Sequence, residues 1–385
     1  MIFFPTVFDL FFSLIIFSMG LLCAIRISKF FVIKSKRAAI LYFWHTIFCI
    51  FYAYYVVING GDAVGYYESS LASEIDISVG TAFIVLLTRL FSYYLDFSFL
   101  SVSLIFNIFG TIGLIAFDGA MRYASFDKKK SIRILASLVI FLPSVSFWSS
   151  AIGKDSLSFM SVGIALWAAS DFFRRSKLMY FSILLMFLIR PHIAALMIFG
   201  IFSSIIFNSK NSAKKKLVTS LLLLLFAAGF LPFVLNYAGL GDVGNIGGVE
   251  DYISERQESN LDGGSSVDLS SMNPLMQLFT YLFRPMLFEA SSVLSVAAAL
   301  DNLVLLFIFL LGLKGIWKSW GKQDHAIIGN RIFMWSYSIF AWIILAVTTA
   351  NLGISIRQKW MFVPMLMFLL ISAISTRSSE IKQRN

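Results

Sequence analysis

Apolar segments close to the length that crosses a lipid bilayer recur along the whole sequence. A hydrocarbon layer of about 30 Å needs a helix of about 20 apolar residues, and a chain inside it must satisfy its own backbone hydrogen bonds. These segments lie at residues 3–24, 38–58, 100–121, 134–150, 156–173, 178–190, 193–207, 217–237, 290–313, 331–349 and 360–375. With 58% hydrophobic and 14% charged residues, the composition excludes a soluble globule. We predict an all-α, polytopic integral membrane protein of about eleven transmembrane helices.

The basic residues predict the orientation of these helices. Lys and Arg gather in six segments, in every second loop: 26–37, 122–133, 174–177, 210–216, 314–331 and 377–384. Because basic loops stay in the cytoplasm, the pattern predicts an outer amino terminus and a cytoplasmic carboxyl terminus. The first apolar segment is expected to be a retained helix, since no basic residues precede it and no small-residue cleavage site follows it. The net charge of +10 therefore reflects orientation, and no nucleic-acid partner is expected.

Two long segments are predicted to lie on the outer side of a single transmembrane domain, 1–385. The first, 59–99, contains a semi-apolar stretch, 79–95, which we expect to form an interfacial helix. The second, 238–289, is rich in Gly, Ser and Asp. Loops of this length in a compact protein commonly bind substrate or cover a site. The sequence has no nucleotide-binding or zinc-binding motif, so we predict no cofactor and no metal site.

Cations on the outer side are the main functional signal. Of the 31 Lys and Arg, 24 lie in the six basic segments, and the other seven are Arg89, Lys154, Arg190, Arg256, Arg284, Arg357 and Lys359. The orientation rule does not require them there, so several are expected to have a partner or a ligand. Four lie in three short broken elements, and with Arg284 at the end of the second outer loop we expect up to five to converge on one outer cavity: Lys154, Arg190, Arg284, Arg357 and Lys359.

Such a cavity suits a phosphate or diphosphate at the level of the lipid headgroups. Arginine offers a planar fork of donors for phosphate oxygens, and a low dielectric strengthens each contact. Nearby carboxylates can pair with the cations or act as a general base. The aromatic rings of Tyr66, Tyr67 and Trp148 suit stacking on sugars.

These features resemble the membrane polymerases of bacterial surface polysaccharides. This family includes O-antigen (Wzy-like) and exopolysaccharide (EpsG-like) polymerases and is related to the GT-C glycosyltransferases. Short motifs spread over most of the chain carry the resemblance: Asp62 to Tyr67, Pro143 through Trp148 to Lys154-Asp155, Arg190-Pro191-His192, Gly264 to Asp268, Phe283-Arg284-Pro285 with Glu289, and Asn351-Leu352-Gly353 with Arg357.

The resemblance implies a GT-C-like fold and polymerisation of oligosaccharide repeats at the periplasmic face of a bacterial inner membrane. A growing glycan would leave its undecaprenyl diphosphate and join a hydroxyl of an incoming lipid-linked repeat. The candidate catalytic carboxylates are Asp62, preferred because GT-C relatives place an acid in the first outer loop, Asp155 and Glu289. The candidate substrate-binding residues are Tyr66, Tyr67, Lys154, Arg190, His192, Arg284 and Arg357. Expected partners are the undecaprenyl-diphosphate-linked oligosaccharide, membrane lipids, a polysaccharide flippase and a chain-length regulator.

Other functions fit part of the pattern. A GT-C enzyme with a polyprenyl-monophosphate sugar donor would need fewer cations and one dominant loop acid. A transporter or flippase of lipid-linked glycans would show polar residues through the midplane and inverted repeats, whereas the polar content here lies mainly on the outer side. A non-enzymatic scaffold leaves the clustered cations unexplained.

Structural roles are open for the same residues. A helix cap, a turn or an interfacial anchor is the alternative for Lys154 with Asp155, for Asp62, for Arg190 and Arg284, and for Arg357 with Lys359. His45 and His192 are expected to be packed or hydrogen-bonded histidines. Arg89 and Arg256 are expected to be solvated or to face lipid.

Overall fold

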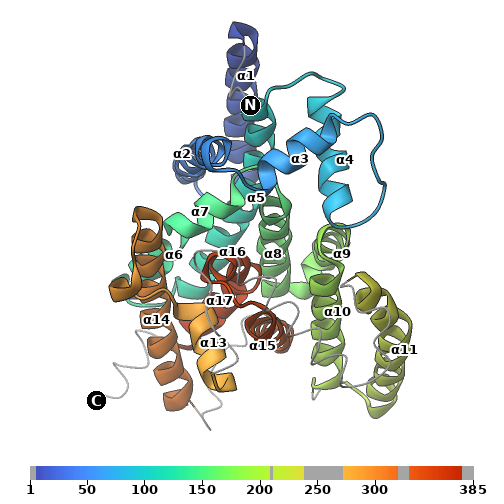
Figure 1. The fold of residues 1–385 in the computed structure, drawn as a ribbon. Coiled ribbons are helices and arrows are strands. Elements are labelled where there is room, and N and C mark those ends of the chain that lie inside the picture. The colour runs from blue at the N-terminus through green and yellow to red at the C-terminus, as the bar shows by residue number, and fades with distance from the viewer. Residues whose placement is uncertain (1–5, 209–210, 238–271, 320–328, 375–385) are drawn as a thin grey trace.

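The computed structural model describes residues 6–208, 211–237, 272–319 and 329–374, and these residues form helices without a β-strand (Figure 1). The α-helices are α1 Val7–Ser28, α2 Ser35–Asn59, α3 Asp62–Ser70, α4 Thr81–Ser92, α5 Phe99–Ser125, α6 Lys130–Ile140, α7 Pro143–Ser149, α8 Lys154–Ser170, α9 Phe172–Ile189, α10 Pro191–Ile206, α11 Ala213–Tyr237, α13 Pro274–Phe283, α14 Val293–Ser319, α15 Arg331–Thr348, α16 Leu352–Gln358 and α17 Val363–Ala373. Two short 3-10 helices are η1 Leu287–Glu289 and η2 Lys359–Met361. The predicted all-α class is confirmed.

Six helices in the described part of the chain are long and apolar enough to cross a bilayer. They are α1, α2, α5, α6 continued by α7, α14 and α15, and the bent pair made of α16–η2 and α17 gives a seventh if it counts as one span. The chain therefore has the helices of a polytopic membrane protein. Each of the eleven predicted segments overlaps a helix, but α8 has 17 residues, α10 has 16 and α17 has 11.

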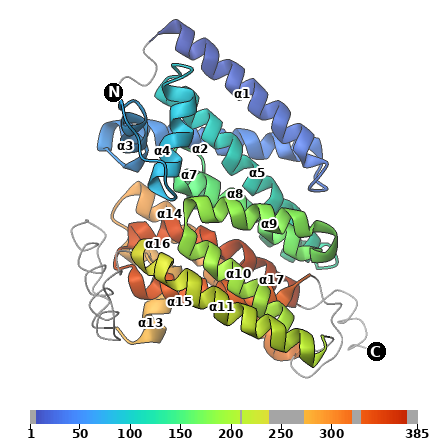
Figure 2. The same ribbon diagram turned by 90° about the vertical axis from the view of Figure 1, so that its right-hand side faces the viewer.

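Helix α8 lies at the centre of the molecule. Every residue from Ser156 to Ser170 is buried. Helix α5 packs on one side of α8 and α9 on another, and α1 and α2 pack on α5 (Figure 2). The backbones of α5 and α8 touch at Gly113 and Gly163, where a Cβ on either glycine would overlap the opposite backbone. Small residues allow helices to approach this closely inside a membrane, so the α5–α8 pair is a fixed core.

The helices from α10 onward form the other part of the bundle. Helix α10 packs on α15, α14 packs on α17, and α13 contacts α14 and α15. The break between α9 and α10 is sharp because Arg190 alone is non-helical and Pro191 begins the new helix. A second break separates α6 from α7 ahead of Pro143. These breaks hold side chains from several helices at one end of α8.

Described residues of the basic segments, or close to them, lie at the opposite end of α8. The backbone N–H of Asn330 donates to the carbonyl of Ala169 at 2.7 Å, and Lys128 Nζ donates to the carbonyls of Ser372 and Ile374 at 3.1 and 2.6 Å. The ring of Phe31 meets Trp167, with centroids 5.6 Å apart. We call this the basic end. Arg175 also donates to the carbonyl of Trp167 at 2.9 Å, so residues of five of the six basic segments, or residues close to them, meet there, as the alternating pattern predicts.

The loop predicted at 59–99 fits the gap between α2 and α5, and the helix expected at 79–95 is α4. One prediction about this loop is wrong. Arg89 is 7% exposed, and its guanidinium donates to the carbonyls of Ser70, Ala72 and Ser73 while it lies 4.1 Å from the ring centre of Tyr93. Arg89 ties α4 to the end of α3. An arginine can be buried with its charge when backbone carbonyls accept hydrogen bonds from its guanidinium.

The segment predicted as a second loop, 238–289, contains the unexpected helix α13. Asn273 caps it through Met276 N at 2.9 Å, and Pro274 occupies its first turn. Residues 238–271, with Arg256 and the Gly264 to Asp268 motif, lie outside the described residues.

Candidate functional site

An ion-paired cluster lies at the end of α8 that is opposite the basic end. Asp155, in the first turn of α8, accepts from Arg190 Nη2 at 2.8 Å through one carboxylate oxygen. Its other oxygen accepts from Arg357 Nε. Asp62, the first residue of α3, accepts from Arg357 Nη1 at 2.6 Å. We call Asp62, Lys154, Asp155, Arg190 and Arg357 the Asp155 cluster, and all five belong to the predicted site.

The local sequence explains why these side chains meet. Arg190 occupies the single non-helical position between α9 and α10, and its buried side chain reaches the carboxylate of Asp155 from this break. Asn351 caps α16 by accepting from the backbone N–H of Gly353 and Ile354 at 2.8 and 3.3 Å. That short helix presents Arg357 in its last turn. Residues almost 300 positions apart in sequence, Asp62 and Arg357, are thereby brought into contact.

The Asp155 cluster carries more positive than negative charge, with three cations against two carboxylates. Burial, together with the charge of Arg190, lowers the pKa of Lys154 to about 8, at the start of α8. The Tyr66 ring lies against Gly153, the residue before Lys154, and burial together with the charge of Asp62 raises the pKa of Tyr66 to about 12. The Asp62 side chain is 52% exposed, whereas that of Asp155 is 11% exposed. Asp62 is therefore the carboxylate that a ligand can displace most easily.

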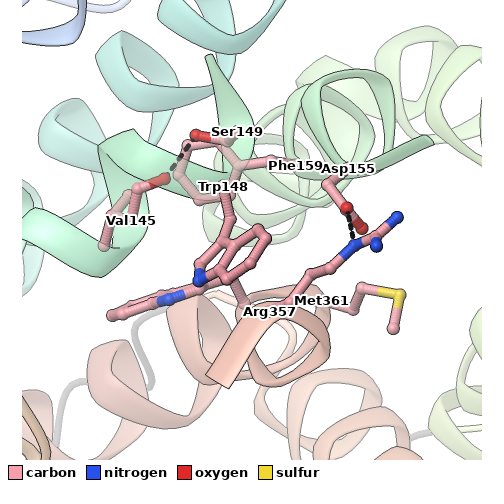
Figure 3. A pocket seen from close by; sticks show the side chains of 8 residues that line it. Val145, Trp148, Ser149, Asp155, Phe159, Arg357 and Met361 are labelled. Atoms are coloured by element: carbon pink, nitrogen blue, oxygen red, sulfur yellow. Dashed lines mark hydrogen bonds and ion pairs between the residues drawn. The ribbon is translucent and has the colours of Figure 1, made fainter. Parts of the chain in front are cut away.

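A narrow pocket opens beside the Asp155–Arg357 pair (Figure 3). Its lining includes Asp155, Arg357, Trp148, Ser149 and Trp360. The Arg357 guanidinium lies 6.0 Å from the ring centre of Trp148. The free volume of about 10 Å³ suits one water molecule. A larger ligand would have to displace the arginine from its carboxylates.

Two buried donors near this pocket have no acceptor among the described residues. They are Arg190 Nε and the indole Nε1 of Trp360, in side chains that belong to buried residues. Native proteins satisfy nearly all buried donors with protein, water or a ligand. Both groups can only donate, so the acceptor that suits them is an anion or a water molecule.

Arg284 and Glu289 form a pair of their own. Arg284 Nη2 lies 2.6 Å from Glu289 Oε1, and the other carboxylate oxygen accepts from Met286 N at 2.7 Å. Burial raises the pKa of Glu289, but these hydrogen bonds and the charge of Arg284 outweigh burial and lower the pKa below its usual value. The pair closes a turn after α13. It belongs to the predicted site residues, yet its described partners are local.

A buried polar group connects this turn to η2. Lys359, with no exposed surface, donates to Asn302 Oδ1, and Asn302 Nδ2 donates to the carbonyl of Pro285 at 3.0 Å. The neighbouring Asp301 accepts from the backbone N–H of Ser144 at 2.7 Å. The prediction that five cations converge on one cavity is therefore wrong for two of them. Three lie in the Asp155 cluster, Arg284 pairs with Glu289, and Lys359 is held inside the bundle. The Asp-Asn pair in an apolar run was the available signal for this group.

The remaining predicted residues lie around these groups. Tyr67 donates through its hydroxyl to the carbonyl of Phe97 at 2.8 Å and packs its ring edge-on against Phe99, so it holds α3 to the start of α5. His192 lies in the first turn of α10, two residues after Arg190. The residues described by the structure hold no group of three or more His, Cys, Asp or Glu spaced for a metal ion.

In comparison with known proteins, the chain matches no protein-family model, no curated protein and no solved structure.

Proposed function

We propose that this protein is a GT-C-like polymerase of oligosaccharide repeats carried on undecaprenyl diphosphate. The Asp155 cluster would bind the diphosphate of a lipid-linked glycan, and the hydroxyl of a second lipid-linked repeat would replace it at the anomeric carbon. The proposal includes eleven transmembrane helices, an outer amino terminus and a periplasmic site in a bacterial inner membrane.

The observation that carries the proposal is the meeting of three cations from three broken elements. Lys154 follows the α7–α8 break, Arg190 occupies the α9–α10 break, and Arg357 ends α16. They meet at the end of the bundle that lacks the basic segments, where the orientation rule does not require cations. A charge excess of one and the free donors of Arg190 and Trp360 suit a ligand with several anionic oxygens.

The chemistry follows from the ion pairs. Phosphate oxygens entering the cluster would replace Asp62, the most exposed carboxylate, on Arg357. Two arginines in a partly buried site would then stabilise the charge that develops as the diphosphate departs. Tyr66 and Trp148 lie beside these cations and offer flat faces to the sugars.

The test uses purified protein in lipid with a single undecaprenyl-diphosphate-linked repeat. Because donor and acceptor are the same compound, we expect a ladder of longer products without nucleotide sugar or polyprenyl-monophosphate sugar. Extension by one sugar, seen only with a polyprenyl-monophosphate donor, would replace this proposal with the monosaccharide-transferase alternative. Transport of intact lipid-linked repeats without elongation would favour a flippase.

A further inference from the structure

We propose that Ser149 is a catalytic residue of the polymerisation and that His45 accepts the proton through it. This inference rests on the function proposed above and assigns the general base of that reaction. Ser149, the last residue of α7, lines the pocket together with Asp155 and Arg357. His45 lies on α2 behind it and is completely buried.

The side chains form a continuous array. His45 Nε2 lies 3.0 Å from Ser149 Oγ, and His45 Nδ1 lies 2.6 Å from Asn107 Oδ1 on α5. Asn107 Nδ2 donates to Thr46 Oγ1 at 2.8 Å. A hydroxyl, an imidazole and an orienting amide in this order are the arrangement that activates a serine.

A close approach of helices makes this array possible. Gly110 on α5 lies against α7, and a Cβ there would overlap the carbonyl oxygen of Ser149 and come within 2.6 Å of His45 Cε1. Because Gly110 has no side chain, the imidazole of His45 fits next to the end of α7. Gly110, His45 and Ser149 therefore fit together as one packing unit.

The hydrogen bonds assign the tautomer of His45. Asn107 donates its amide N–H to Thr46, so its oxygen faces Nδ1 as an acceptor. Nδ1 therefore carries the proton, and Nε2 presents its lone pair to Ser149. The Ser149 hydroxyl also lies 2.6 Å from the carbonyl of Val145, which offers its proton a second acceptor (Figure 3). In this state the array can take one proton at Nε2.

The three predicted carboxylates are less suited to this task. Asp155 accepts from two arginines, Asp62 from Arg357, and Glu289 from Arg284. Each carboxylate is occupied by hydrogen bonds from arginine, and each would have to leave its partner before it could accept a proton. His45 needs no such exchange, because its Nε2 already faces a hydroxyl at the pocket.

In the proposed step, Ser149 passes a proton from the acceptor hydroxyl to His45. The acceptor hydroxyl gives its proton to Ser149 Oγ while Ser149 gives its own proton to His45 Nε2. The acceptor oxygen bonds to the anomeric carbon as the bond from that carbon to the diphosphate oxygen breaks, and the electron pair leaves with the diphosphate. The imidazolium then returns its proton through Ser149 to the released diphosphate.

The test replaces Ser149 with a thiol and measures its reactivity in the absence of any lipid substrate. In a Cys23→Ala, Cys49→Ala background, the rate of reaction of Ser149→Cys with methyl methanethiosulfonate reports how much of the thiol is ionised. We expect the rate to fall at least about tenfold when His45→Gln is added, since a neighbouring imidazole lowers a thiol pKa by a unit or more. Trp44→Phe is the control on the same helix. It removes an indole N–H that has no acceptor among the described residues, its ring packs on Phe48 and Phe141, and it should leave the rate unchanged.

A second variant, Asn107→Asp, and separate measurement of kcat and KM complete the test. Asn107→Asp keeps the acceptor for Nδ1 and adds a charge that makes the imidazole more basic, so the thiol should react faster. In the ladder assay, His45→Gln should lower kcat by about 10²-fold or more with KM unchanged. A thiol rate that is independent of His45, a thiol that does not react in any variant, or a raised KM with normal kcat would each overturn the inference. These thiol results do not depend on polymerase activity, so failure of the ladder in the wild-type protein overturns the proposed function separately.

Discussion

Two arginine–aspartate groups at opposite ends of the bundle use the same chemistry in different ways. At the basic end, Arg37 donates to both oxygens of Asp118, at 2.7 and 2.6 Å, and to Ser137 Oγ at 2.9 Å. The Asp118 side chain is 1% exposed and that of Arg37 is 22% exposed, so the carboxylate is enclosed and its charge is balanced by one arginine. In the Asp155 cluster the cations outnumber the carboxylates, one carboxylate is half exposed, and Arg190 retains a free buried donor.

The difference separates a structural ion pair from a binding site. A bidentate pair of one arginine and one carboxylate has no surplus charge to offer an anion, and it joins α2 to α5. In the Asp155 cluster, surplus charge and unused donors destabilise the folded protein, and the same two features allow the cluster to bind an anion.

Arg357→Ala should lower the rate of polymerisation by at least about 10²-fold, because each lost donor to a developing charge costs about 2.7–4 kcal/mol. The ladder assay at matched protein concentration measures it. Arg357→Lys should restore little activity, since lysine lacks the planar fork that reaches two acceptors. Full-length products from Arg357→Ala at the wild-type rate would make this arginine a structural anchor like Arg37.

Arg37→Ala should do the opposite and reduce stability rather than activity. Removing it leaves the buried Asp118 carboxylate without a partner, which costs about 3–5 kcal/mol in the free energy of unfolding. Denaturant titration in detergent measures this, and the activity per folded molecule should be unchanged. The double variant Arg37→Met with Asp118→Leu should recover most of the stability. Normal stability combined with lost activity would contradict the contrast.

Trp360→Phe should have a smaller effect, raising KM several-fold, because one hydrogen bond contributes about 1 kcal/mol. Trp44→Phe provides a matched control: its indole N–H is also buried without an acceptor among the described residues, but Trp44 packs on Phe48 and Phe141 and is absent from the pocket lining. Titration of the lipid-linked substrate measures both. Equal changes of KM in the two variants would mean that the indole N–H of Trp360 does not bind the substrate.

Acid should weaken the Arg284–Glu289 pair, and this is the smallest of the expected effects. The pKa of Glu289 is lowered in the folded protein, so its pair with Arg284 stabilises the turn above the ordinary carboxyl pKa and is lost as pH falls through the lower folded value. The hydrogen-exchange protection factors of residues 286–292 should therefore fall only in acid. Glu289→Gln should show lower protection factors at neutral pH and no such acid step. Exchange that is insensitive to both changes would mean that the pair does not hold the turn.

The sequence predicted the helices and the residues of the Asp155 cluster, but it could not assign their partners. Apolar length and basic loops are local signals, and they located the helices and put Lys154, Arg190 and Arg357 away from the basic end. Pairing depends on which broken elements meet, and spacing says nothing about Arg357 reaching both Asp155 and Asp62.

Two errors show where local pattern fails. Arg89 was assigned to solvent or lipid because an isolated cation on an amphipathic helix is usually exposed, whereas here the carbonyls at the end of α3 surround it. Helix α13 was missed because ten residues are too few to cross a bilayer, although Asn273 and Pro274 mark its start. The His45–Ser149 contact joins residues 104 positions apart and leaves no signal in the sequence.

The central claim, that the Asp155 cluster binds a lipid diphosphate, is tested most directly by comparing two ligands. Purified protein in detergent is titrated with undecaprenyl diphosphate and with undecaprenyl monophosphate, and binding is followed by native mass spectrometry. Because the second phosphate adds charge and acceptors for Arg190 and Arg357, the diphosphate should bind at least about tenfold more tightly, which is about 1.4 kcal/mol. Arg190→Ala should remove this preference, and Arg37→Met with Asp118→Leu should keep it. Equal affinity for the two lipids in the wild-type protein would contradict the claim.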